Sequence, residues 1–212
     1  MLQKAFFKVD VVDRIYDTLV FEKTISGAYE FTVPEEYNYV VIEYAGGAGQ
    51  QLAVFGQTSG WNGEIGKGSI KKEKIYVSKS VISGIIGAQP KKERGMSYIG
   101  GSGYKNGTNG FNNDTGIYGG GGGGSTSVNI NGKLYTAGGG GGVGGYAYSI
   151  DKSVFGGAGG APNGGAGQPA PKQGKYDTIY NGNNATDPNQ IGLNSGNGYV
   201  KIWAGYDPYF KG

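Results

Sequence analysis

The residue types that commonly carry out enzyme chemistry are scarce in this chain. It contains no cysteine and no histidine, which excludes cysteine nucleophiles, the common Ser-His-Asp triads and most zinc sites. Its 16 acidic residues could still supply the carboxylate pair of a glycosidase. Most of them neighbour lysines or alternate along expected strands, so we interpret them as surface residues. We therefore predict a protein that is not an enzyme and binds no cofactor.

A glycine-rich chain also invites comparison with phosphate-binding loops. The stretch GEIGKGS contains Lys67, but Gly68 stands where such a loop requires Ser or Thr, and Trp61 stands where it requires its first glycine. The G-x-G-x-x-G pattern within residues 119–124 arises from a run of glycines and has no strand-to-helix context. These departures argue against nucleotide binding.

Two short stretches carry oxygen ligands of the kind that calcium prefers. They are NNDTG at residues 112–116 and ATDPN at residues 185–189. Asn, Asp and Pro are also the residues that tight turns prefer. Turn formation therefore explains both stretches, and we expect no metal site.

Two other stretches combine aromatic residues with Gly, Asn and Ser, namely GYKNGTNGFNNDTGIYGG and GGYAYSIDKSVFGG. Tyrosine offers a large contact area at a low entropy cost, and Asn and Ser offer adaptable hydrogen bonds, as in antibody loops. The alternative is that the aromatic rings only cover the edges of the glycine-rich region. For the loops taken together we favour binding. The candidate receptor-binding residues are Tyr104, Phe111, Tyr118, Tyr146, Tyr148 and Phe155.

The charge pattern argues against nucleic acid and membrane as partners. The formal net charge is +3, and lysines alternate with acids in stretches such as GSIKKEKIYVSKS, as on solvated strand edges. Arginines are few, whereas a nucleic-acid groove would need a more one-sided basic patch. No apolar run approaches the roughly 18 residues of a membrane span, so we expect no membrane insertion. Acidic residues interrupt the start of the chain before a signal peptide could form.

Alternating side chains predict strands on both sides of the glycine-rich region. Tyr29, Phe31 and Val33 alternate with polar residues up to Pro34, as in a half-buried strand. Residues 39–42 are continuously apolar, as in a strand covered on both faces. A second β region ends at Pro90, and the last strand, GYVKIWAG, places Val200, Ile202 and Ala204 on one face. No stretch has helical periodicity with caps. We predict an all-β domain whose first and last strands come from opposite ends of the chain.

Residues 118–142, YGGGGGGSTSVNINGKLYTAGGGGG, place a hairpin between two glycine blocks. Asn131-Gly132 is the preferred pair for a type I′ turn, and the alternating residues around it fit paired strands. The hairpin would return the two blocks side by side. Polyglycine segments in polyproline II geometry have no internal hydrogen bonds and no Cβ, so neighbours can approach closely and pair their backbones. The alternative is a set of flexible linkers, but the blocks lack the serine alternation of linkers and flank a defined turn.

In this order, the elements resemble a known domain. The series GAYEFTVPEEYNYVVIEYAGGAGQ, GKGSIKKEKIYVSKSVISGIIGAQ, GGGGGGSTSVNINGKLYTAGGGGGVGG and GNGYVKIW is similar to the glycine-rich domain of bacteriophage tail-fibre tip adhesins and related phage tail proteins. It is also similar to the glycine-rich domain of the anaplastic lymphoma kinase receptor group. The receptor-kinase versions carry cysteines, which this chain lacks, so the resemblance favours the phage side.

The resemblance implies a jelly-roll-like β-sandwich with an inserted bundle of polyglycine II helices, whose connecting loops lie at the tip. We expect one such domain at residues 27–212, with sandwich strands at about 27–90 and 197–205 and the polyglycine insertion at about 95–170. Residues 1–26 form a candidate attachment segment.

The function that the resemblance implies is that of a phage tail or tail-fibre adhesin. Its loops would bind a bacterial cell-surface receptor, either an outer-membrane protein or a glycan, and other tail or fibre proteins would be its further partners. The protein would be made in the host cytoplasm and reside in the virion. The alternative is a purely structural virion component, a cap or joint of a fibre or capsid.

Overall fold

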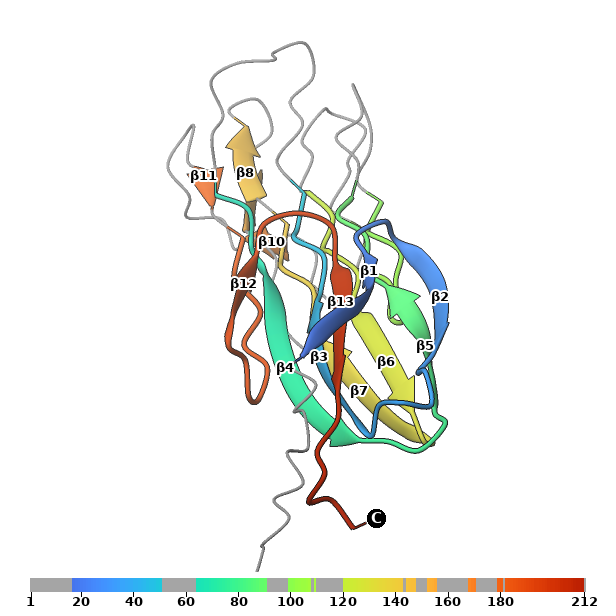
Figure 1. The fold of residues 1–212 in the computed structure, drawn as a ribbon. Coiled ribbons are helices and arrows are strands. Elements are labelled where there is room, and N and C mark those ends of the chain that lie inside the picture. The colour runs from blue at the N-terminus through green and yellow to red at the C-terminus, as the bar shows by residue number, and fades with distance from the viewer. Residues whose placement is uncertain are drawn as a thin grey trace, which may run out of the picture.

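The computed structural model describes residues 17–50, 64–90, 99–107, 109, 120–142 and 182–211, together with the backbone of four short strands between residues 144 and 180. Within these residues every helix or strand is a β-strand, and every strand pair is antiparallel. The all-β prediction is therefore confirmed for the described part of the chain (Figure 1).

A five-stranded sheet joins the two ends of the chain. Its strands lie in the order β1 (Thr18–Lys23), β13 (Tyr199–Gly205), β3 (Tyr39–Ala45), β4 (Gly68–Tyr76) and β12 (Gly192–Asn194). The last strand, β13, lies between the early strands β1 and β3. Strand β1 falls within the candidate attachment segment 1–26, of which residues 1–16 lie outside the described residues.

A four-stranded sheet contains the predicted hairpin. Its order is β2 (Gly27–Thr32), β5 (Val81–Ile86), β6 (Thr126–Ile130) and β7 (Lys133–Ala137). Asn131 and Gly132 connect β6 to β7 with φ values of 51° and 75°. Both values are positive, as a type I′ turn requires, and Ile130 pairs with Lys133. The turn prediction is confirmed.

The two sheets share one hydrophobic core, an arrangement compatible with a β-sandwich. The five-stranded sheet contributes Val40, Ile42, Tyr44, Val200, Ile202 and Ala204, and the four-stranded sheet contributes Tyr29, Ile82, Ile86, Val128, Ile130 and Ala137. Burying one such valine or isoleucine side chain fully is worth about 1.5–3 kcal/mol. Along β13 the core residues alternate with the half-buried Tyr199, Lys201 and Trp203, as the sequence pattern predicted.

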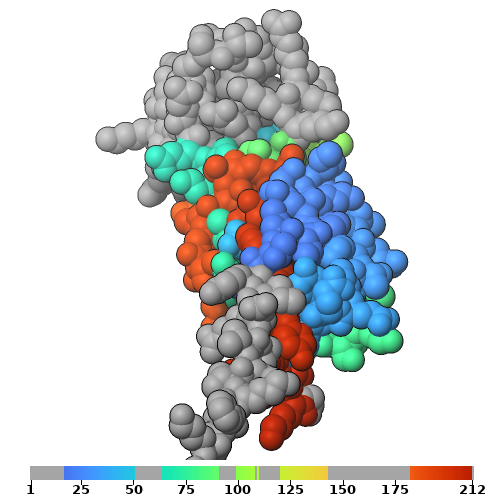
Figure 2. Space-filling model, in the orientation of Figure 1, coloured from blue at the N-terminus to red at the C-terminus, as the bar shows by residue number. Residues whose placement is uncertain are grey.

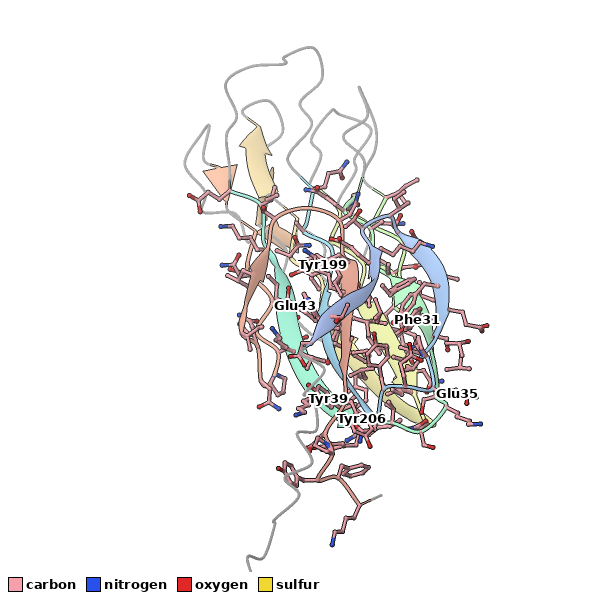
Figure 3. All side chains as sticks on the ribbon, in the orientation of Figure 1. Phe31, Glu35, Tyr39, Glu43, Tyr199 and Tyr206 are labelled. Atoms are coloured by element: carbon pink, nitrogen blue, oxygen red, sulfur yellow. The ribbon has the colours of Figure 1, made fainter. Side chains whose placement is uncertain are left out.

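Strand β3 is covered on its second face only in part. Its even-numbered residues are in the core, whereas Val41 and Glu43 are half-buried on the outer face. Glu43 accepts a hydrogen bond of 2.9 Å from the hydroxyl of Tyr199 on β13, and Val41 pairs with Trp203 (Figure 3). Side chains of neighbouring strands, rather than a further layer of backbone, therefore cover this face.

A third sheet has four short strands, three of which lie within the region predicted to be the polyglycine insertion. Its order is β10 (Gln168–Ala170), β9 (Lys152–Phe155), β8 (Gly144–Ala147) and β11 (Ile179–Tyr180). Part of the stretch 95–170 is therefore ordinary β-sheet. Tyr146, Val154, Phe155 and Ile179 in these strands are of residue types that favour extended backbone.

Candidate functional site

The described glycine segments continue the strands of the two large sheets beyond one end of the core (Figure 1). Residues 46–50 follow β3, residues 87–90 follow β5 and residues 138–142 follow β7. Residues 64–67 precede β4, and residues 120–125 precede β6. The strands thus determine where each glycine segment joins the sheets.

Hydrogen bonds from residues 46–50 repeat every third residue. Successive amides in this segment donate to three different neighbouring segments, and amides three residues apart donate to the same neighbour. The bonds are Gly46 to Ser69 O (3.0 Å), Gly47 to Gly124 O (2.9 Å), Ala48 to Gly196 O (2.8 Å), Gly49 to Gly66 O (2.8 Å) and Gln50 to Gly121 O (2.8 Å). None of them lies within the segment itself, so its amides bond laterally.

The same spacing recurs between other segments. Further pairs of amides three residues apart donate to carbonyls that are also three residues apart. They are Gly66 and Ser69 to Gly141 and Gly138, Gly101 and Tyr104 to Gly122 and Ser125, and Gly182 and Ala185 to Glu64 and Lys67, at 2.8 to 3.0 Å. The described glycine segments are therefore bonded to their neighbours, as predicted, and are not free linkers.

Close approach of backbones explains why these positions are glycine. A Cβ atom on Gly49 would overlap the carbonyl oxygen of Gly141, and one on Gly140 would overlap that of Gly66. Neither position has the positive φ that side chains avoid. A side chain is excluded here by a neighbouring carbonyl group and not by the local backbone conformation.

Hydrogen bonds from polar side chains connect the glycine segments to one another and to the ends of the strands. The hydroxyl of Thr126 donates to Ala45 O at 2.5 Å and accepts from the amide of Gly87 at 2.9 Å. The side-chain oxygen of Gln50 accepts from the amide of Gly121 at 3.0 Å. These bonds satisfy backbone groups at the junction, where sheet pairing ends.

Asp187, in the stretch ATDPN, also connects a glycine segment to the end of a strand through hydrogen bonds. Its Oδ2 accepts from the hydroxyl of Ser69 at 2.8 Å and from the amide of Gly138 at 2.5 Å, and its side chain is buried. The carboxylate thus joins the start of β4 to the end of β7. Among the described residues, no group of three His, Cys, Asp or Glu side chains is arranged to hold a metal ion.

Among the predicted binding residues, Tyr104 is the one whose backbone and side chain both lie in the described part of the chain. Tyr104 is 38% exposed, and its amide donates to Ser125 O directly before β6. It therefore lies where the glycine segments meet the four-stranded sheet. The ammonium group of Lys105 lies 5.6 Å from the centroid of its ring. Phe111, Tyr118 and Tyr148 lie outside the described residues.

The register of the third sheet brings two other predicted residues together. Tyr146 on β8 pairs with Ser153, and Phe155 lies two residues further along β9. Residues two apart on a strand share a face, as do paired residues. Tyr146 and Phe155 therefore occupy positions on the same face of this sheet.

Tyr180 is a third aromatic residue at this face, and the sequence analysis missed it. It pairs with Gly144, which lies two residues before Tyr146 on β8. The pairing joins residues far apart in the sequence, and IY is too short a stretch to predict a strand. No local pattern could have identified the position.

The opposite end of the molecule is where the chain enters and leaves the sheets. Thr18 pairs with Ala204, and the C-terminal residues extend beyond β13 at that end (Figure 2). Tyr39 and Tyr206 lie there (Figure 3). The Tyr39 hydroxyl donates to the Asp17 carboxylate at 2.5 Å, a bond that, together with burial, raises the pKa of Tyr39 to about 12. This bond connects the residue before β1 to the first residue of β3.

Exposed aromatic residues also gather at this end. The rings of Tyr76 and Phe210 stack with centroids 4.0 Å apart, and the Tyr76 hydroxyl donates to Asp207 at 2.8 Å. Tyr206 and Tyr209 add further exposed rings from the C-terminal segment. The aromatic cluster of Tyr76, Tyr206, Tyr209 and Phe210 thus lies at the end opposite to the glycine segments.

Comparisons with known proteins leave the site's geometry as the main guide to function. No protein-family model matches the chain, and no curated protein matches it. No helix in the described ranges is long and apolar enough to cross a membrane.

Proposed function

We propose that the chain is a phage tail or tail-fibre adhesin that holds receptor-binding loops on a bundle of polyglycine II helices. It has no enzymatic role in this proposal. The three-residue repeat of lateral hydrogen bonds is the observation that carries it. Polyproline II geometry has three residues per turn and sends every amide outward, so amides three residues apart should reach the same neighbour, as they do in residues 46–50.

Such a bundle would make a thin and rigid support. Each residue of a polyglycine II helix advances by about 3.1 Å, so a six-residue segment spans roughly 19 Å. The segments at residues 46–50, 120–124 and 138–142 are bonded to one another, which favours stiffness over the behaviour of separate linkers. Loops attached to stiff neighbours lose less conformational entropy when they bind a receptor.

The two ends of the molecule suit two different contacts. The glycine segments lead into the stretches that contain most of the predicted binding residues, whereas the aromatic cluster of Tyr76, Tyr206, Tyr209 and Phe210 lies at the other end. Aromatic residues are enriched in protein interfaces. We propose that the loop end binds the bacterial receptor, an outer-membrane protein or a glycan, and that the cluster contacts other tail or fibre proteins in the virion.

The experiment that tests the proposal changes the loops without changing the fold. All six predicted aromatic residues, including Tyr104 and Phe155, are replaced by Ser or Ala in the virion protein, and adsorption of the phage to its host is measured. Adsorption should fall strongly while the thermal melt of the purified chain stays similar. Replacement of exposed Ile25 and Leu134 by Ser is the control and should leave adsorption unchanged.

Unchanged adsorption of the loop variant would refute receptor binding by these residues. Electron microscopy of labelled particles separates the adhesin from a purely structural cap or joint. A distal position of the chain on the tail agrees with the adhesin, and an internal position agrees with the joint.

A further inference from the structure

We infer that Tyr44, Asp187 and Gln190 form a site for one monovalent cation, sodium or potassium, where the carboxylate of Asp187 joins β4 to β7. The site is independent of the proposed receptor-binding function. In the described part of the chain, three buried side-chain oxygens have no hydrogen-bond partner, and they are Tyr44 Oη, Asp187 Oδ1 and Gln190 Oε1. Buried polar atoms in folded proteins almost always have a partner, so each of these atoms calls for an explanation.

A turn places Asp187 and Gln190 next to each other. Pro188 and Asn189 are its two central residues, and Asn189 has a φ of 56°. Proline followed by a residue of positive φ is typical of a type II turn, whose first and fourth Cα atoms lie within about 7 Å of each other. Asp187 and Gln190 are the first and fourth residues of this turn. A carboxylate oxygen and an amide oxygen only accept hydrogen bonds, so these two atoms cannot bond to each other.

The core side of β3 brings Tyr44 to the same place. Tyr44 pairs with Lys71 on β4, and Ser69 lies two residues before Lys71, so all three share the inner face of the five-stranded sheet. The hydroxyl of Ser69 donates to Asp187 Oδ2 at 2.8 Å. Burial raises the pKa of the Tyr44 hydroxyl, and the nearby Glu73 and Asp187 raise it further. The phenol therefore stays protonated, and its oxygen is a neutral ligand.

The charge of Asp187 favours a cation over a neutral ligand. Its side chain is buried, with 7% of the residue exposed, and its Oδ2 accepts from Ser69 and Gly138 at 2.8 and 2.5 Å, as an ionised carboxylate does. Within the described ranges no lysine or arginine forms an ion pair with it. Buried charges are normally paired with an opposite charge or coordinate a metal ion. A water molecule would leave the charge uncompensated.

The neighbouring charged residues on β4 offset each other. Lys71 donates its ammonium to the carbonyl of Thr136 at 3.0 Å, and Glu73 follows two residues later on the same face. Asp187 thus leaves one negative charge around Tyr44, which matches a single positive charge. Among the described residues no three His, Cys, Asp or Glu side chains form a group that could hold a metal ion. One carboxylate and two neutral oxygens therefore fit a monovalent cation better than a tightly bound divalent one.

A cation at this position would connect the sandwich to the glycine segments. Gly138, whose amide the Asp187 carboxylate binds, begins the segment 138–142 after β7. Tyr44 lies directly before the last residue of β3, which the segment 46–50 follows. These two segments bond to each other, so a cation bound by Tyr44 and Asp187 would fix the starting points of both.

The first test measures whether stability depends on the cation. The full chain is melted in sodium chloride, potassium chloride and choline chloride at the same ionic strength. A ligand that binds only the folded state raises its stability, so sodium or potassium should raise the melting temperature by about 2–4 °C. Choline is too large for a buried site and serves as the reference. Equal melting temperatures in the three salts would overturn the inference.

Gln190→Glu gives opposite expectations with and without a bound cation. A second carboxylate should strengthen cation binding and enlarge the difference between sodium or potassium and choline. Two adjacent buried carboxylates without a cation repel each other, so the variant would then lose the same stability in all three salts. That uniform loss would overturn the inference.

Two further variants remove parts of the site, and a third is their control. Asp187→Asn removes the charge but keeps an acceptor oxygen, and Tyr44→Phe removes one ligand but keeps the ring in the core. The first should abolish the cation-dependent shift and the second should reduce it. Glu35→Gln removes a carboxylate from the exposed ion pair with Lys79 and should keep the full shift. Melts in choline show which variants fold, and Tyr44→Phe alone decides if Asp187→Asn does not. A shift that persists in the site variants, or is lost in the control, would overturn the inference.

A crystal soaked in thallium(I), which substitutes for potassium and scatters anomalously, identifies the ligand directly. An anomalous peak should lie beside Asp187 Oδ1 in the parent protein and be absent from Asp187→Asn. A peak without anomalous signal would show an ordered water in its place and would overturn the cation site.

Discussion

The amide of Gly140 donates a 2.9 Å hydrogen bond to the carbonyl of Gly47. Gly140 lies in the glycine segment that follows β7, and Gly47 lies in the segment that follows β3. A third segment completes the contact, because Gly47 donates to Gly124 O at 2.9 Å and Gly123 donates to Gly140 O at 2.8 Å. Each of these three glycine segments is therefore hydrogen-bonded to the other two through its backbone, and no side chain lies between them. We call this arrangement the glycine ring.

A single methyl group in this ring should destabilise the protein. In Gly140→Ala the new Cβ would overlap the carbonyl of Gly66, so the backbones must separate. Overpacking of this kind costs roughly 1–3 kcal/mol or more, measured as a lower midpoint of urea unfolding. Gly196→Ala is the matched control, since nothing lies within 4 Å of its Cβ. Equal stability of both variants would contradict the close approach.

The buried carboxylate of Asp187 should stabilise the junction through its acceptor oxygen. In the parent protein the amide of Gly138 donates to Asp187 Oδ2 at 2.5 Å. Asp187→Ala removes this acceptor and leaves the amide without a hydrogen-bond partner. A buried donor without an acceptor costs about 1–3 kcal/mol. Asp187→Asn keeps an acceptor oxygen and should lose less. Chemical denaturation of the three proteins measures the difference, and an alanine variant as stable as the parent would show that the bond contributes nothing.

Amides of the glycine segments should exchange slowly with solvent hydrogen. Gly47, Gly49, Gly123 and Gly140 each donate to a carbonyl of a neighbouring segment, and exchange of such amides requires local opening. Hydrogen-deuterium exchange with peptide resolution should show protection comparable to that of the core strand β3. Exchange as fast as in an unfolded peptide would contradict the bonded bundle, whatever the stability of the sheets.

Alkaline pH should destabilise the end that carries Tyr39. Its phenol has a pKa of 10.0 in the absence of perturbation and about 12 in the fold, because it donates to Asp17 and is partly desolvated. The raised pKa means that the stabilisation is complete below pH 10 and is lost as the pH rises toward 12. Burial raises the pKa of Tyr44 in the same direction.

Denaturant midpoints between pH 8 and pH 11.5 check this expectation. The midpoint should fall above about pH 10, and Tyr39→Phe should lower the stability at pH 8 while flattening the fall. A fall that is identical in the parent and the variant would assign the effect to other tyrosines.

Local patterns in the sequence were sufficient for strands β2 to β5, for the hairpin of β6 and β7 and for β13. Tyr29 and Val33 are buried around exposed Glu30, as their alternation predicted. Asn131-Gly132 forms its turn because only a few residue types accept positive φ at both positions. These features depend on residues close together in the chain, whose preferences can be read without knowing the fold. The aromatic composition of the loops could be read in the same way, but not the positions at which their residues meet.

What the sequence by itself determined is an all-β chain with glycine segments able to bond through their backbones. Only the tertiary structure decided which segments pair, because glycine has no side chain that distinguishes one block from another. Gly47 bonds to Gly124 and Gly140 because β3, β6 and β7 bring their ends together in the two sheets. The pairing of Tyr180 with Gly144, which places Tyr180 on the same face of the third sheet as Tyr146, was likewise decided by long-range strand pairing.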